Sequence, residues 1–182
     1  MNLSFRFFRR GCDSFGNVAN FVETEQIIEH NESLTSFVQT RGSIPFFWKQ
    51  SPTLAYLPKP QIYTHVDHSA PFHIHMEKLV HNYGTQVLVN LINHNKHEGI
   101  LQAKFQELHQ TCSLKQHVEY TAFDFHANPG QKLGILINAL KPRLEQVIFN
   151  FSQINVHFVR KIERIFACCN LTRKSGHLFL GN

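Results

Sequence analysis

The chain has 182 residues, of which 42% are hydrophobic and 12% aromatic, so it can bury the core of one domain and does not read as disordered. No stretch approaches about 18 consecutive apolar residues, so a transmembrane segment is not expected. The formal net charge is +5, with the excess near both ends, and charge alone fits solvated ends as well as attraction to anionic lipid or nucleic acid.

The first fifty residues predict a β-meander. Segments rich in β-branched and aromatic residues alternate with turn residues, which is typical of strands joined by short turns. Strands are expected at residues 4–9, 18–29 and 34–41, with turns at 11–17 and 30–33. Three prolines in residues 51–60 indicate an extended connector after the meander.

A helical pattern begins at Ser69 and ends at Tyr83. Apolar residues recur there at helical spacing, Ser69 is placed as an N-cap, and Gly84 is a fitting C-terminal stop. A buried strand is expected at residues 85–92, a helix at 97–111, a strand at 118–125, and a further helix from Gln131 that Pro142 kinks or divides.

This order of elements predicts an α/β fold. Strand, helix and strand in succession indicate a parallel βαβ unit with a right-handed crossover. The expected architecture is therefore an N-terminal β-meander that leads into a mixed, partly parallel sheet with crossover helices. Because functional groups gather beyond the carboxyl ends of parallel strands, the loops at residues 90–95 and 124–131 are the candidate functional loops.

Polar side chains alternate along residues 20–26. In a strand, Asn20 would lie on one face, and Glu23 and Glu25 would lie together on the other. Two carboxylates on one face favour a cationic partner if they are buried, and Arg41 on the next strand is the candidate. A solvated strand face is the alternative.

Two further segments carry groups suited to chemistry. Arg41 precedes Gly42 and Ser43, a tight turn whose N–H donors, with the guanidinium, can hold an anion. Asp124 and His126 lie at the end of a buried strand, where a carboxylate and an imidazole can act as acid, base or orienting pair. A turn with a solvated arginine and a purely structural strand end are the alternatives.

Cysteine and histidine spacing favours neither a disulfide scaffold nor a metal site. Four cysteines are too few for a disulfide framework of this length, and no pair has the two-residue gap of a zinc or redox motif, so a reducing compartment is expected. The 13 histidines complete no tetrahedral zinc set at a known spacing, so no metal and no cofactor is expected. The first ten residues lack the pattern of a secretory signal.

Taken together, these segments resemble the Sac family of phosphoinositide phosphatases. They occur in the order and at about the spacing of that family, over roughly residues 5–150. Two details, Ser69-Ala70-Pro71-Phe72 and the segment after His126, are closer to its synaptojanin branch. The matching stretches are residues 9–11, 16–26, 36–45, 47–48, 90–91 and 123–126.

The resemblance implies removal of phosphate from inositol lipids through a Cys-x5-Arg loop. There a cysteine thiolate attacks phosphorus while backbone N–H groups and the arginine hold the phosphoryl oxygens. This sequence departs from that pattern, because Cys168 precedes Arg173 by five positions and Cys169 by four, where six are required. No catalytic residue is therefore assigned.

The expected organisation is a partial Sac phosphatase domain at residues 1–150 and a divergent basic tail at residues 151–182. The N-terminal subdomain of the family and the Cys-x5-Arg loop are without counterparts, which fits a truncated product or an incomplete gene model. The candidate pocket-side or supporting residues are Asn20, Glu23, Glu25, Arg41, Asp124 and His126.

Three functional hypotheses follow. The parent protein is expected to be a phosphoinositide phosphatase, cytoplasmic and peripheral to membranes, whose partners are inositol lipid headgroups and not nucleic acid. The chain by itself is expected to be an inert partial domain, with weak binding of anionic lipid or protein as the alternative activity. A fragment that does not fold stably is the third hypothesis, since a parallel sheet without its later strands leaves core and edges uncovered.

Overall fold

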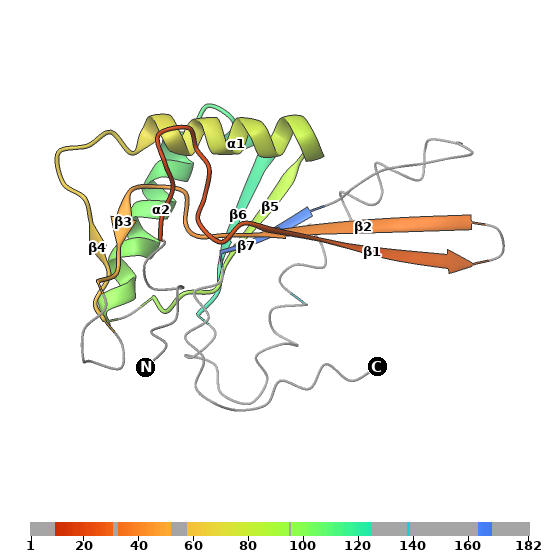
Figure 1. Cartoon of the computed structure of the whole chain (residues 1–182), viewed down its shortest axis with the longest axis horizontal. Helices are drawn as coiled ribbons and strands as arrows, with labels where there is room; N and C mark the ends of the chain where they lie inside the picture. Colours follow the sequence, from red (N-terminus) through yellow and green to blue (C-terminus); the bar gives the residue numbers. More distant parts are fainter. Residues whose placement is uncertain are drawn as a thin grey trace.

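The computed structural model describes residues 10–30, 33–51, 58–94, 96–124, 138 and 164–168. A five-stranded sheet in the order β1-β2-β7-β5-β6 forms its centre (Figure 1). The strands are β1 (Val22–His30), β2 (Ser33–Arg41), β5 (Gln86–Asn90), β6 (Val118–Ala122) and β7 (Arg164–Cys168). A separate two-stranded sheet pairs β3 (Trp48–Lys49) with β4 (Gln61–Ile62).

Strands β1 and β2 form a long antiparallel hairpin, in register from Val22 opposite Arg41 to His30 opposite Ser33. Figure 1 shows this hairpin reaching well away from the helices. The two strands were expected, but β1 begins four residues later than predicted. Its start is delayed because the preceding residues form a turn, in which the Ala19 N–H donates to Gly11 O and Asn20 has a φ of 56°.

The rest of the sheet is parallel. β5 pairs with β6 and with β7, and β7 pairs with β2, all in parallel. Helix α2 (Gly99–Thr111), preceded by the 3-10 turn η2 (Lys96–Glu98), lies between β5 and β6 in the sequence. A second 3-10 turn, η3 (Lys115–His117), leads into β6. The predicted mixed α/β sheet with a parallel βαβ unit is therefore confirmed.

Helix α1 (Ser69–Tyr83) ends where the sequence predicts it, at Gly84, whose φ is +75°. Its start differs in detail from the prediction. The N-cap position is His68 rather than Ser69, and the Asp67 carboxylate accepts the Ser69 N–H at 2.8 Å. An acidic side chain two residues before the helix thus satisfies one of its free donors.

The hydrophobic core lies between the helices and the parallel strands. Every residue of β5 is buried, and Phe105 of α2 stacks edge-on against Phe72 of α1 and Tyr120 of β6, with ring centroids 5.9 and 5.1 Å apart. The segment after β2 joins this core through Ile44, Phe46 and Trp48. Burial of these large apolar side chains is the main source of the stability of the fold.

Several predicted elements fall outside the described residues. These are the strand expected at residues 4–9 and the helix expected from Gln131, most of the connector at 51–60, and His126. Residues 164–168 lie in the segment expected to be a tail, yet they supply the central strand β7. Among the helices that the structure describes, none has the length and apolar character needed to cross a bilayer.

Candidate functional site

The carboxyl edge of the parallel strands gathers the polar residues of the candidate site. Asn90 is the last residue of β5, and Asp124 lies two residues beyond β6, which pairs with β5 in parallel. Arg41 ends β2, and it lies opposite Ala167 of β7, while Asn90 lies opposite Cys168. Because all these strands run in the same direction, the three polar residues lie at one edge of the sheet.

Asn90 is fully buried and connects β5 with its neighbour. Its Nδ2 donates to the Tyr120 hydroxyl at 2.9 Å, and its Oδ1 accepts the Ile92 N–H at 3.3 Å. Its carbonyl accepts the Phe123 N–H at 2.8 Å, which prolongs the β5–β6 pairing by one bond. A buried amide with these partners fixes the direction in which both loops leave the sheet.

Asp124 joins the two loops directly. Its Oδ2 accepts the backbone N–H of His94 at 3.0 Å, and the residue is only 8% exposed. The loop after β5 and the loop after β6, which were the two candidate loops, therefore touch through this hydrogen bond. The interaction orients the carboxylate and the loop together, which is the role of a positioning group.

The loop after β5 is held from its other side by Glu98. The Glu98 Oε2 accepts both the N–H and the Nδ2 of Asn93, at 3.1 and 2.7 Å. The Oδ1 of Asn93 is buried and has no hydrogen-bond partner within the described ranges. One acceptor with free capacity therefore lies next to His94 at the carboxyl edge.

The register of the hairpin corrects one expectation about Arg41. Residues directly opposite each other share a face, and Arg41 lies opposite Val22, so it is on the other face from Glu23 and Glu25. Glu23 instead accepts the Tyr83 hydroxyl of α1 at 2.8 Å. Arg41 is exposed, which leaves its guanidinium accessible from solvent at the edge of the sheet.

Asn20 and Glu25 lie on two different parts of the N-terminal segment. Asn20 forms the turn before β1, and Glu25 is an exposed residue of the projecting hairpin. The hydrogen bond that joins the two loops is made by His94 and Asp124. The assignment of Asn20 and Glu25 as supporting residues of a pocket stays a prediction, as does that of His126, which lies outside the described residues.

Strand β7 brings Cys168 to this edge. Cys168 is its last residue and lies between the ends of β2 and β5. Cys169 and Arg173 lie outside the described part of the chain. In the residues that the structure describes, no group of three or more His, Cys, Asp and Glu side chains is arranged to hold a metal ion.

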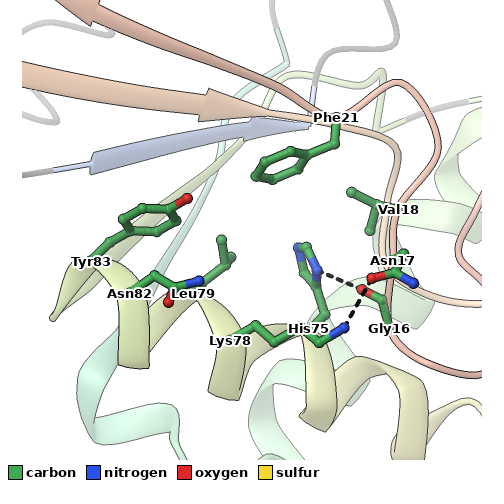
Figure 2. Close-up of a pocket in the computed structure, with 9 residues that line it drawn as sticks. All are labelled: Gly16, Asn17, Val18, Phe21, His75, Lys78, Leu79, Asn82 and Tyr83. Carbon is green, nitrogen blue, oxygen red and sulfur yellow. Dashed lines mark hydrogen bonds between the residues drawn. The ribbon is translucent and has the colours of Figure 1, made fainter.

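A pocket of about 220 Å³ lies away from this edge, between α1 and the segment that precedes β1 (Figure 2). His75 is buried in its wall, and its Nδ1 donates to Gly16 O at 2.8 Å. Lys78 donates to Phe15 O and to the side chain of Asn17, at 2.8 and 2.9 Å. These groups fasten the segment to the helix, so the polar atoms of this pocket have a structural role.

Burial sets the protonation state of His75. Removal from water lowers the pKa of this imidazole to about 4, its hydrogen bond to Gly16 raises the pKa, and Lys78 lowers it further. In Figure 2 the ring points toward Phe21, and the two rings meet edge-on with centroids 6.4 Å apart. His75 is therefore neutral at pH 7.

Sequence reasoning identified the edge but missed some of the residues that build it. Asn93 donates to Glu98 across a turn, and His94 donates to Asp124 through its backbone N–H, which no spacing pattern reveals. Asn90 had a visible signal, since it is the polar end of the otherwise apolar segment Val87–Asn90. A buried polar residue at the end of an apolar strand predicts a positioning role.

The known proteins that we compared with this chain all point to the same family. The model of the SacI homology domain matches residues 2–129. The chain is 45% identical over 145 residues to phosphatidylinositol-3-phosphatase SAC1 of Drosophila melanogaster, which is 78% of this chain and 24% of that protein. It is 39% identical to phosphoinositide phosphatase SAC6 of Arabidopsis thaliana, again over 78% of this chain and 24% of that protein.

The synaptojanin branch is also similar. Synaptojanin-2 of Rattus norvegicus is 38% identical over 142 residues, which cover 77% of this chain and 10% of that protein. The chain thus spans about a quarter, or less, of the length of these relatives. The resemblance proposed from the sequence motifs is confirmed at the level of the family.

Proposed function

Because the chain belongs to the family of SacI homology domains, we propose that it is part of a phosphoinositide phosphatase domain. The relatives described above carry the names phosphatidylinositol-3-phosphatase and phosphoinositide phosphatase. The proposed substrates are phosphorylated inositol lipid headgroups, reached by a cytoplasmic domain that lies at a membrane surface. The observation that carries this proposal is the carboxyl edge of the sheet, along which Arg41, Asn90 and Asp124 lie.

The edge has the parts that anion recognition needs. Arg41 is exposed and offers a guanidinium, which binds phosphate through two parallel hydrogen bonds. Asp124 holds the loop of His94 in place, and so sets the shape of the edge without occupying it. We propose that this edge is the wall of a headgroup pocket, and that Asp124 is a positioning residue in it.

We also propose that this chain alone does not catalyse phosphate release. The thiolate mechanism needs the nucleophile and the guanidinium on one short loop, in which the arginine follows the cysteine at the sixth position. Here Arg173 follows Cys168 at the fifth position and Cys169 at the fourth. A shorter loop has fewer N–H groups to surround the phosphoryl oxygens and cannot bring the guanidinium to the same place.

A second candidate function is weak binding of anionic lipid by a catalytically inert domain. The observation that favours it is the net charge of +5, which produces attraction to an anionic bilayer at low ionic strength. Such binding needs no catalytic loop, and it falls as salt rises.

The test is phosphate release from phosphatidylinositol monophosphates in vesicles by the purified 182-residue chain. We expect no release above that of the Cys168→Ser and Cys169→Ser variants. Turnover that either variant abolishes would overturn the proposal of inactivity. Sedimentation with the same vesicles at low and at high salt tests the second candidate, which predicts binding that salt removes.

A further inference from the structure

A cysteine and a histidine face one cavity far from the carboxyl edge. Cys112 caps the end of α2 that leads toward the start of β6, whereas Asp124 lies beyond the end of β6. The cavity has a volume of about 340 Å³ and lies between the first turns of α1 and the end of α2. Neither residue has a part in the function proposed above.

The two side chains are within hydrogen-bonding reach. The Sγ of Cys112 lies 3.8 Å from the Nδ1 of His73, and the Ser113 hydroxyl lies 3.3 Å from the same nitrogen. Cys112 is 7% exposed and lines the cavity wall, and this low exposure favours a small reagent over a bulky one. An imidazole within reach of a thiol can act as a general base for it during nucleophilic attack.

We propose that Cys112, activated by His73, is a modification site for small peroxides. His73 accepts the thiol proton, and the thiolate sulfur attacks one oxygen of the peroxide. The S–O bond forms as the O–O bond breaks, and the leaving hydroxide takes the proton from the imidazolium to give water. The sulfur is oxidised to sulfenic acid by two electrons, and the peroxide is reduced.

Cys12 provides an internal comparison. It is the other free cysteine whose side chain the structure describes. Burial, with a smaller contribution from Asp13, raises the pKa of the Cys12 thiol to about 12. Cys12 is therefore expected to stay a thiol at pH 7, and to report the reactivity of a cysteine that has no activating base.

The test exposes the whole chain to hydrogen peroxide and traps sulfenic acid with dimedone, followed by peptide mapping. Cys112 should be trapped at least about tenfold faster than Cys12, and His73→Gln should slow Cys112 by about tenfold. Ser113→Ala is the matched control, because it removes a hydroxyl that competes for Nδ1 and should not slow the reaction. Equal rates at the two cysteines, or a rate unaffected by His73→Gln, would overturn the proposal.

A measurement on the unchanged chain covers the case in which His73→Gln does not fold. The trapping rate at Cys112 is compared before and after unfolding in urea. Activation by a neighbour that folding brings from 39 residues away predicts a faster reaction in the folded chain. A faster reaction in the unfolded chain would mean that the contact between His73 and Cys112 only joins the two helices.

Discussion

The carboxylate of Asp124 accepts the backbone N–H of His94 at 3.0 Å, and this bond joins the loops that follow β5 and β6. Asp124→Ala removes the acceptor and leaves a partly buried N–H unsatisfied, which we expect to cost about 1–3 kcal/mol of unfolding free energy. Asp124→Asn keeps one oxygen as an acceptor and should cost less. Urea denaturation of the two variants measures the difference, and equal losses would contradict this role for the carboxylate.

The sequence predicted most of the parallel part of the sheet, because the signals there are local. The apolar spacing of α1, the stop at Gly84 and the apolar run of β5 each lie within a few residues of the element that they specify. The two candidate loops are also where the sequence places them, while their role as a site stays a prediction. The ends of β5 and β6 were identified, since polar residues that follow buried strands are visible in the sequence.

What could not be predicted depends on contacts between distant residues. Strand β7 pairs with β2 and β5, which precede it by more than seventy residues, and its own sequence does not specify that register. The contact of Asp124 with His94 uses a backbone donor, which any residue type at that position supplies. The start of β1 could not be predicted either, because it is set by a backbone hydrogen bond from the Ala19 N–H to Gly11 O.

Gly11 and Gly84 allow the effect of close packing on stability to be measured separately from the effect of backbone strain. Both have positive φ, of +74° and +75°, but an added Cβ at Gly11 would lie 2.5 Å from Phe46 O, whereas nothing lies within 4 Å at Gly84. Gly84→Ala should therefore cost about 1–3 kcal/mol through strain alone. Gly11→Ala should cost more, because strain and overlap with the backbone add. Thermal unfolding compares them, and similar losses would show that the overlap relaxes easily.

Tyr83 connects α1 with the projecting hairpin through its hydroxyl, which donates to Glu23 at 2.8 Å. The bond is exposed to solvent, so Tyr83→Phe should change the unfolding free energy by less than about 1 kcal/mol. Hydrogen exchange should nevertheless speed up in the first residues of β1, since the variant loses this link between helix and strand. Unchanged exchange in β1 would show that pairing with β2 alone holds the strand.

His75 makes the stability of the fold depend on pH. Its pKa is about 4 in the folded chain and 6.5 in its ordinary state, so the unfolded chain binds more protons between these values. Stability therefore rises with pH across this window and is lost on acidification. Between pH 7 and pH 5 the expected loss is about 2 kcal/mol from this group.

His75→Asn is the matched variant for this effect. An asparagine amide can take the place of Nδ1 as the donor to Gly16 O, and it does not titrate. The variant should be less stable than the natural chain at pH 7, because it fills less of the space beside Phe21, but its stability should change by about 2 kcal/mol less between pH 7 and pH 5. Urea midpoints at both pH values measure this. If both chains lose the same free energy on acidification, another group is responsible for the pH dependence, and the pKa of His75 is not lowered as proposed.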